Sequence, residues 1–316
     1  MAFIYNEKQL SDVSTKFHIY GEIKHAEACK IGHINETYTA TYGQGGNLVR
    51  YIHQKINGNV FKRPVQVMEN VDRVTRHIRS KLVANGEKNV TRKVLIIVPA
   101  RDGKCYFKDP EGNFWRTFVF IENIRTYESF SSSGKTVEAG KALGRFVRHL
   151  SDMEGPRLHE TIPNFHNVRM RFDAFIKALQ KDRFNRATNA AEEIKFFKEH
   201  EAIVRKLEKA LSSGGLPERI THNDTKFNNV LLDAETGKEQ CVVDLDPVMP
   251  GNILNDFGDM VRTTTSPTME DELDLTKVKV RLPLFKALAR GYLKSTKDIL
   301  TKKEKKLIAF SGKKMT

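Results

Sequence analysis

The chain has 316 residues, which is long enough for two lobes that each bury a core of their own. Its 39% hydrophobic and 29% charged residues are ordinary for a globular protein, and its longest apolar run, VLIIVPA at 94–100, is too short to span a membrane. The net charge of +14 is typical of nucleic-acid binders and of proteins that handle anionic small molecules, but no zinc-finger or RNA-binding signature is present.

Cysteine usage and the N-terminal segment indicate a cytoplasmic protein. Cys29, Cys105 and Cys241 are far apart and form no CxxC pair, which argues against a disulfide framework and fits a reducing compartment. The first twenty residues lack the apolar stretch of a signal peptide. We expect neither a membrane partner nor a nucleic-acid partner. The basic segment 301–316 is expected to be a solvated helix face with a loose end.

The first 120 residues predict a small antiparallel sheet with one helix against it. The helix is expected from Pro64 to Leu82, because five apolar residues recur there at spacings of three and four. Turn signals such as GQGGN at 43–47 separate the strands. The predicted strands cover residues 27–32, 33–42, 48–56, 93–100 and 114–121.

Helical periodicity dominates the rest of the chain. Apolar residues recur at helical spacings over 142–150, 172–179 and 194–211, and a strand–loop–strand region at 219–245 interrupts these helices. The predicted fold class is therefore α+β and bilobal, with a ligand cleft between the lobes. We expect a nucleotide-binding lobe at 1–122, a hinge at 123–132 and a catalytic and acceptor-binding lobe at 133–316.

The segment THNDTKFNNVLLD at 221–233 carries the pattern HxDxxxxN, formed by His222, Asp224 and Asn229. Phosphoryl transfer needs positioned carboxylates and a metal ion on the phosphates more than covalent chemistry from the protein. Asp224 lies in a loop, where it could accept a proton from a substrate hydroxyl. Asn229 starts the next strand, and an antiparallel return would bring Asp244 of VVDLD beside it. Oxygen ligands of this kind suit magnesium.

Neighbouring polar residues extend this candidate site. Lys226 is expected to meet the transferred phosphate, Asp246 to be a second metal ligand, and His222 to brace the loop. The polar side chains of NDFGDMVR at 255–262 would brace the loop or contact the acceptor, and they are Asp256, Asp259 and Arg262. Each of these residues also has a structural alternative as a turn cap, a strand end or a solvated side chain.

The N-terminal lobe is expected to bind ATP. The loop between its first two strands contains a single glycine, which is a weak phosphate-binding signal, and its candidates are Gly32, His33, Ile34 and Asn35. The third strand offers Ile52, Gln54 and Lys55, and alternation lets only one of the last two face the cleft. Peptide groups at 120–124, around Ile121 and Glu122, are expected to form hydrogen bonds with adenine.

With these residues in place, the chain resembles the aminoglycoside phosphotransferase and choline kinase superfamily, and within it the N-acetylhexosamine 1-kinases. The resemblance implies a protein-kinase-like fold and an ATP- and Mg²⁺-dependent small-molecule kinase. It implies that Asp224 is the catalytic base, that Asn229 and Asp244 hold magnesium, and that the anomeric hydroxyl of N-acetylglucosamine or N-acetylgalactosamine is the acceptor. The stretches that carry it are GHINETY, LVRYIHQKIN, VMENVDRVTRHI, IPNFHN, THNDTKFNNVLLD and VVDLDPVMPGNILNDFGDMVR.

Two departures from this resemblance leave alternatives open. Gln54 stands where many relatives outside this branch have a phosphate-binding lysine, so Lys55 or another cation would take that role. The chain ends where relatives continue into further helices, so the acceptor pocket is expected to be shortened or built differently. Choline, ethanolamine, homoserine or an aminoglycoside are alternative acceptors. A silent nucleotide-binding pseudokinase and a basic nucleic-acid binder are the alternatives from other classes.

Overall fold

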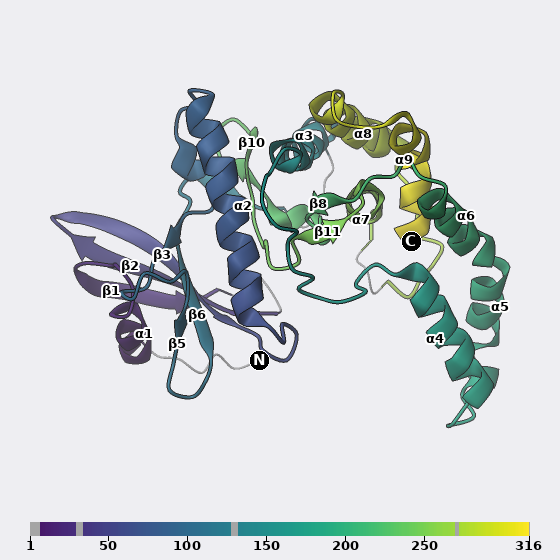
Figure 1. Cartoon of the computed structure of the whole chain (residues 1–316), viewed down its shortest axis with the longest axis horizontal. Helices are drawn as coiled ribbons and strands as arrows, with labels where there is room; N and C mark the ends of the chain where they lie inside the picture. Colours follow the sequence, from purple (N-terminus) through teal and green to yellow (C-terminus); the bar gives the residue numbers. More distant parts are fainter. Residues whose placement is uncertain (1–6, 30–33, 128–131, 269–271, 316) are drawn as a thin grey trace.

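The computed structural model of the chain describes residues 7–29, 34–127, 132–268 and 272–315. The chain folds into a sheet-rich N-terminal lobe and a mainly helical C-terminal lobe (Figure 1). The described helices are α1 (Glu7–Ser14), α2 (Pro64–Ala84), α3 (Ser133–Leu150), α4 (Val168–Lys181), α5 (Ala191–Glu199), α6 (Glu201–Ser212), α7 (Ile253–Thr265), α8 (Leu282–Thr296) and α9 (Lys302–Met315). The described strands are β1 (Glu22–Ala28), β2 (Glu36–Gln44), β3 (Asn47–Ile56), β4 (Ile97–Val98), β5 (Phe107–Lys108), β6 (Phe114–Val119), β7 (Ile124–Arg125), β8 (Arg219–Thr221), β9 (Val230–Asp233), β10 (Glu239–Val242) and β11 (Met249–Gly251).

The N-terminal sheet is antiparallel, with strand order β1-β2-β3-β6-β4 and β5 paired with β6. The predicted sheet with one long helix is thus confirmed. The strand expected at 93–100 is reduced to the two residues of β4, because Val94 leaves the sheet and packs into the main core while Val98 packs on the opposite face. Strand β1 begins earlier than predicted, and α1 was not foreseen.

The two faces of this sheet have different surroundings. Side chains at alternate positions of β3, such as Tyr51 and His53, point to the outer face with Trp115 and the buried side chains of α1. The intervening residues, Ile52 and Ile56, point to the inner face and pack against the main core. Because side chains alternate along a strand, Gln54 shares the inner face and Lys55 the outer one.

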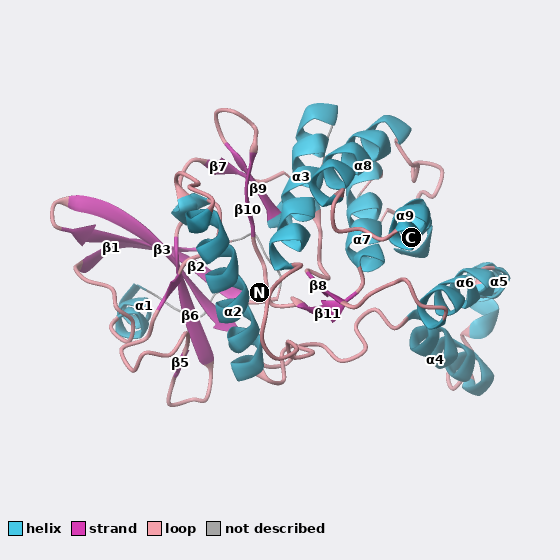
Figure 2. Cartoon of the chain, turned by 45° about the horizontal axis from the view of Figure 1, so that its top comes forward, coloured by secondary structure: helices cyan, strands magenta, loops and turns pink. Residues whose placement is uncertain are grey.

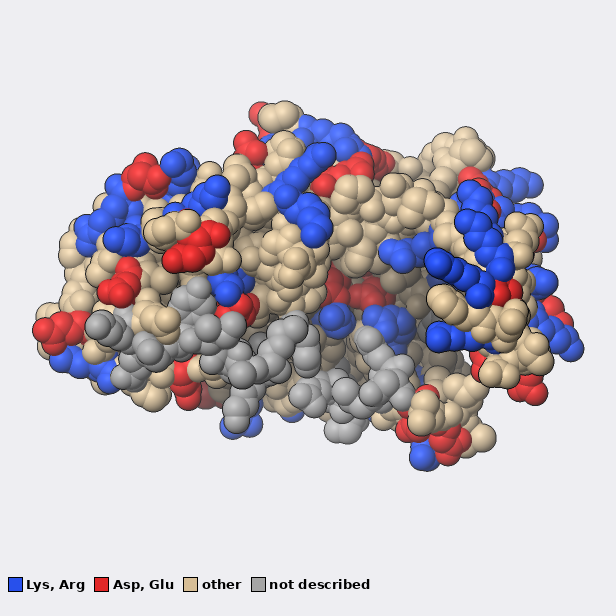
Figure 3. All heavy atoms as spheres, turned by 90° about the horizontal axis from the view of Figure 1, so that it is seen from below, with Lys and Arg blue, Asp and Glu red and all other residues tan. Residues whose placement is uncertain are grey.

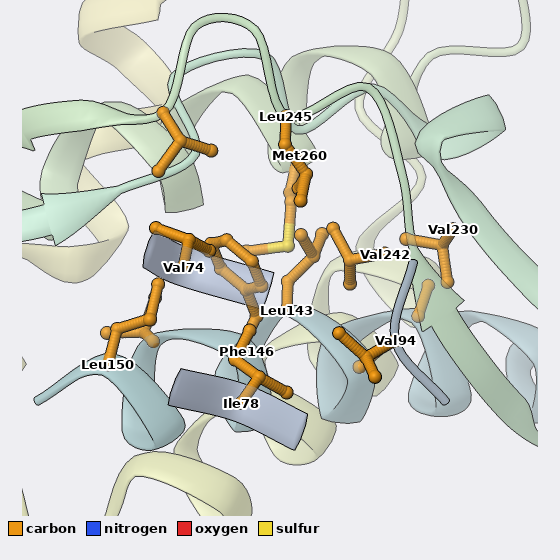
Figure 4. Close-up of a cluster of buried hydrophobic side chains, with 14 of the residues drawn as sticks. Val74, Ile78, Val94, Leu143, Phe146, Leu150, Val230, Val242, Leu245 and Met260 are labelled. Carbon is orange, nitrogen blue, oxygen red and sulfur yellow. The ribbon is translucent and has the colours of Figure 1, made fainter. Parts of the chain in front are cut away.

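The main core is shared by the two lobes, and a second cluster of buried apolar side chains lies within the N-terminal lobe alone. Val74 and Ile78 of α2 belong to the same buried cluster as Leu143 and Phe146 of α3 and Met260 of α7 (Figure 4). Burial of such apolar side chains is the main favourable term in folding. The lobes are therefore packed on each other through α2.

Close helix packing organises the C-terminal lobe. Gly140 of α3 faces α8 so closely that a Cβ atom there would lie 2.4 Å from the Leu288 carbonyl oxygen. Helices α7 and α9 meet in the same way, since a Cβ on Gly258 would lie 2.4 Å from the Ser311 carbonyl oxygen. The basic C-terminal segment therefore packs as helix α9 against α7, and the prediction of a loose end was wrong.

Helices α4, α5 and α6 form an arm on one side of the C-terminal lobe (Figure 2). The predicted periodic segment at 194–211 is two helices, because the chain turns at His200, which ends α5 and precedes α6. Helix α4 forms over the expected segment but has no buried residue. Its apolar face is thus only partly covered.

Candidate active site

The loop with the HxDxxxxN pattern lies between two short antiparallel pairs. Strand β8, before the loop, pairs with β11, and strand β9, after it, pairs with β10. The loop closes with a single 3-10 turn, Phe227–Asn229, so Asn229 ends the turn and β9 begins one residue later than predicted. Asn223 has a left-handed backbone with φ of 67°, which asparagine tolerates better than most residues.

Asp256 of α7 holds this loop from behind. Its carboxylate accepts the backbone N–H groups of His222 at 2.9 Å and Asn223 at 2.8 Å. Its own burial raises the pKa of Asp256 to about 6, and the two N–H bonds oppose this rise by stabilising the charged form. Asp256 is 1% exposed, so it braces the loop and does not line an open acceptor site.

Asp259 also supports the loop, and Arg262 pairs with it. The Asp259 carboxylate is therefore not part of an open acidic surface. Thr225 donates its hydroxyl to the Asp256 carbonyl oxygen at 2.7 Å and lies 3.3 Å from Oδ2 of Asp259. Arg262 forms an ion pair with Asp259 at 2.7 Å. Of the two roles expected for this segment, the structure thus favours bracing over acceptor contact.

The structure brings Asp224, Asn229 and Asp244 together. The side-chain amide of Asn229 donates to the Asp224 carbonyl oxygen at 2.8 Å and lies 3.3 Å from its Oδ2. The N–H of Val243 donates to the Asn229 carbonyl oxygen at 2.9 Å, which sets Asp244 beside the loop. Burial, and then the charges of Asp246 and Asp224, raise the pKa of Asp244 to about 6. This site therefore has a surplus of negative charge that a cation would offset.

His222 and Lys226 flank Asp224. His222 is fully buried, its Nε2 donates to the Val243 carbonyl oxygen at 2.9 Å, and its Nδ1 accepts the Asp224 N–H at 3.3 Å. These bonds fix the tautomer and tie the loop to the end of β10, as a bracing residue would. The Lys226 ammonium lies 3.4 Å from Oδ1 of Asp224, and its side chain is 40% exposed.

Asp246 is engaged by the N-terminal lobe. Both of its oxygens accept N–H groups of Arg116 on β6, and Oδ2 also accepts the side-chain amide of Asn35 at 2.6 Å. Arg116 and Asp246 are 2% and 1% exposed. This pairing argues against the expected role of Asp246 as a free second metal ligand.

Arg116 is the residue that the sequence analysis missed. Its Nε donates to Oε1 of Gln54 at 2.9 Å, since the two residues are register partners on β3 and β6. A charged residue inside the apolar strand FWRTFV was the available signal, because a charge within such a strand is buried only with a partner.

Gln54, not Lys55, lies on the inner face of the sheet. Lys55 forms an ion pair of 2.5 Å with Glu36, its register partner on β2, on the other side of the strand. The amide nitrogen of Gln54 donates to Thr37 at 3.0 Å. The question of which residue faces inward is thereby answered, and no lysine of β3 lies on the inner face.

The remaining nucleotide candidates lie in loops next to strands β2 and β6. Ile34 is 39% exposed, and its carbonyl oxygen accepts the Asn57 amide at 3.0 Å. Ile121 is buried beside β9 and β10, and the Glu122 carbonyl oxygen accepts Arg92 at 3.1 Å. Gly32 and His33 lie outside the described residues.

A pocket of about 250 Å³ adjoins the loop at Asn223. His166 forms part of its wall and donates from Nε2 to the Asn223 carbonyl oxygen at 3.0 Å. Arg157 pairs with both acidic residues of this pocket, Glu160 at 3.0 Å and Glu218 at 2.8 Å. On the face seen from below, acidic and basic side chains also gather near the middle, beside the helical arm (Figure 3). The pocket is therefore polar, and its two carboxylates share the single guanidinium of Arg157.

The two lobes and this loop define the kinase-like class of phosphotransferases, and comparison with known proteins agrees. Residues 25–279 match the model of the phosphotransferase enzyme family, so the chain belongs to that family. It is a phosphotransferase that acts on a hydroxyl group. No helix among the described residues is long and apolar enough to cross a membrane.

Solved structures of this class share the fold at low sequence identity. An aminoglycoside phosphotransferase from Alicyclobacillus acidocaldarius is 12% identical with a TM-score of 0.62, and the match covers 100% of this chain and 84% of that one. A spectinomycin phosphotransferase solved with ADP and spectinomycin is 15% identical (TM-score 0.51; 90% and 79% covered). A choline kinase from Cryptosporidium parvum is 15% identical (TM-score 0.52; 93% and 78% covered).

Proposed function

We propose that the protein is an ATP- and Mg²⁺-dependent kinase that transfers the γ-phosphoryl group to a hydroxyl of a small molecule. The observation that carries this proposal is the convergence of Asp224, Asn229 and Asp244 on one loop and hairpin, held by the buried Asp256. Phosphoryl transfer depends mainly on such positioning and charge compensation.

In this proposal Asp224 accepts the proton of the acceptor hydroxyl. It is only partly buried and its loop is fixed at both ends, so its carboxylate is held in place without being sealed from a ligand. Lys226, beside it, would offset charge on the transferred phosphoryl group. A carboxylate base of this kind contributes about 10²- to 10⁴-fold to rate.

The residues present fit a magnesium ion that is shared with the nucleotide. The Asn229 amide nitrogen donates to Asp224, which leaves its amide oxygen for a metal, and Asp244 supplies a carboxylate in a site with excess negative charge. No cluster of three or more His, Cys, Asp or Glu side chains suited to a metal occurs in the described part of the chain. Magnesium typically takes one or two protein ligands and the phosphates, and when bound it would neutralise phosphate charge.

An N-acetylhexosamine is the acceptor that we favour, and the pocket beside Asn223 supports it over a cationic acceptor. Its acidic residues, Glu160 and Glu218, are paired with Arg157, and Asp256 and Asp259 are buried behind the loop. A quaternary ammonium would need unpaired carboxylates or an aromatic cage. Neutral hydroxyl and acetamido groups are instead matched by the amide and imidazole groups of the wall, from Asn164, His166 and Asn167.

ADP release with Mg-ATP across a panel of acceptors tests the proposal. The panel is N-acetylglucosamine, N-acetylgalactosamine, galactose, choline, ethanolamine, homoserine and an aminoglycoside. Turnover with the N-acetylhexosamines alone is the expected result, with the sugar 1-phosphate as product. Turnover only with another acceptor would retain the reaction and refute the sugar. Binding of Mg-ATP with no turnover on any acceptor would contradict the proposed function and favour a pseudokinase.

A further inference from the structure

Arg116 is a charged residue in an otherwise apolar row. On the inner face of the sheet, β6 presents Phe114, Arg116 and Phe118, and both phenylalanines belong to or pack against the main core. Replacing a buried ion pair by apolar side chains is often neutral or stabilising. Stability alone therefore gives no reason for an arginine at this position.

The hydrogen-bond contacts of Arg116 lie at the junction of the sheet and the candidate metal site. Its Nε is held by Gln54 at 2.9 Å, Nη1 contacts the Met68 sulfur at 3.7 Å, and Nη2 donates to Oδ2 of Asp246 at 3.0 Å. Asp246 follows the candidate magnesium ligand Asp244 by two residues. The guanidinium is thus positioned between the sheet and the place where the proposed reaction needs positive charge.

The Asp246 carboxylate marks an anion-binding position. It receives the guanidinium of Arg116 from β6 and, at 2.6 Å, the amide of Asn35, the residue before β2. A phosphate presents paired oxygens to a guanidinium in the same bidentate way as a carboxylate does. We propose that Arg116 is the cation that binds the nucleotide phosphates, and that Asp246 holds it in place until the nucleotide arrives. This inference rests on the proposed function, because it assumes a phosphorylated nucleotide in the cleft.

The positions of Lys55 and Gln54 on β3 agree with this role for Arg116. Lys55 is on the outer face with Glu36, so it is turned away from the cleft. Gln54 occupies the inward position of β3, and its carbonyl oxygen orients the Nε edge of Arg116. The positive charge expected on β3 is therefore supplied by β6, one strand across.

Exchange of Asp246 for a phosphate would leave no buried charge unpaired. The guanidinium passes from one anion to another, and the released carboxylate lies close to Asp244, where the metal ion that accompanies the nucleotide would compensate it. Bidentate arginine contacts of this kind are stronger than neutral hydrogen bonds.

Binding of ADP and of adenosine to matched variants, measured by calorimetry in EDTA, tests this inference. Arg116→Gln alone would leave Asp246 buried without its partner, so the change is made in an Asp246→Asn background and compared with Asp246→Asn itself. We expect the double variant to bind ADP about 10- to 100-fold more weakly than Asp246→Asn. Adenosine, which has no phosphate, should bind the two variants within about two-fold.

Two further variants define the position of the charge. Lys55→Gln removes a cation from the same sheet but from its outer face, and should leave ADP affinity within about two-fold of wild type. Adding Gln54→Lys to the double variant restores a cation on the inner face and should recover most of the lost ADP affinity. Thermal unfolding of each variant identifies any that fails to fold.

The outcomes separate this inference from the proposed function. Equal losses of ADP and adenosine affinity, or no loss of ADP affinity, would overturn the role of Arg116. A selective loss for ADP in a protein that binds ADP but phosphorylates no acceptor would support Arg116 and refute the kinase. Turnover that survives with unchanged ADP affinity in the double variant would support the kinase and refute the role of Arg116.

Discussion

The loop at 222–229 and the inner face of the N-terminal sheet differ in how their polar groups are brought together. In the loop, Asp224 and Asn229 are five residues apart and meet through a single turn. On the sheet, Gln54 and Arg116 are 62 residues apart and meet only through strand pairing. A contiguous motif is therefore visible in a sequence, whereas a site assembled by register is visible only in the fold.

Asp224→Asn has the largest expected effect. An amide keeps the shape of the side chain but cannot accept the hydroxyl proton, so kcat should fall by about 10²- to 10⁴-fold while ATP affinity changes little. ADP release under saturating ATP measures the first quantity, and calorimetry the second. Asp102→Asn, at an exposed carboxylate of the N-terminal lobe, is the control. Retention of most of the activity in Asp224→Asn would contradict the role of Asp224 as the catalytic base.

Asp244→Ala should change the response to magnesium. If Asp244 holds the metal with the phosphates, Mg-ADP should bind at least about 10-fold more weakly to the variant, in the range of a lost charged contact. Metal-free ADP should bind as well as to wild type, or better, because a buried negative charge near the phosphates is gone. Titrations with and without magnesium distinguish these effects. Equal weakening in both titrations would contradict a metal-binding role.

Asp256→Ala tests whether the loop depends on support from behind. The variant leaves the buried N–H groups of His222 and Asn223 without an acceptor, and each such group costs about 1–3 kcal/mol. We expect a lower unfolding midpoint in urea and a fall in kcat of about 10-fold or more, since small displacements of positioned groups lower rates. Asp256→Asn retains one carbonyl acceptor and should lie between the alanine variant and wild type. Full activity in Asp256→Ala would show that the loop holds its shape alone.

Much of the fold was predictable because its signals are periodic and local. The apolar spacing of α2, the turn at 43–47 and the antiparallel return to Asp244 all follow from short segments. Helix α1 was missed because its sequence, EKQLSDVS, has few apolar residues, and its buried apolar side chains are Leu10 and Val13. The packing of α9 on α7 was missed because it depends on Gly258 and Gly312, which carry no hydrophobic signal.

Within the candidate site, the sequence identified chemical types better than partners. The sequence left open whether Gln54 or Lys55 faces inward, because the register of the strand was unknown and a shift of one residue exchanges the two faces. Asp246 was assigned to a metal because it follows Asp244 by two, whereas its partner Arg116 lies 130 residues earlier in the chain. No spacing rule joins these two residues.

The prediction with the smallest expected effect on activity concerns the outer face of β3, where His53 adjoins Gln54 in the chain. His53 is fully buried between Tyr42 and Thr117, and burial lowers its pKa to about 4. The unfolded chain takes up this proton near pH 6.5 and the folded chain only near pH 4, so stability should decrease as pH falls through that window, by about 3 kcal/mol in full.

Urea unfolding of wild type and His53→Gln at pH 7.0, 5.5 and 4.5 isolates this contribution. Gln can still bond the two hydroxyls but does not titrate, so its unfolding free energy should fall less between pH 7.0 and 4.5. Other groups titrate in both proteins and cancel in the difference; they include His149, whose burial lowers its pKa to about 4 as well. Parallel pH profiles would mean that His53 is protonated within the folded lobe. The outer face would then tolerate a buried charge as the inner face does, and the contrast between the two faces of β3 would be lost.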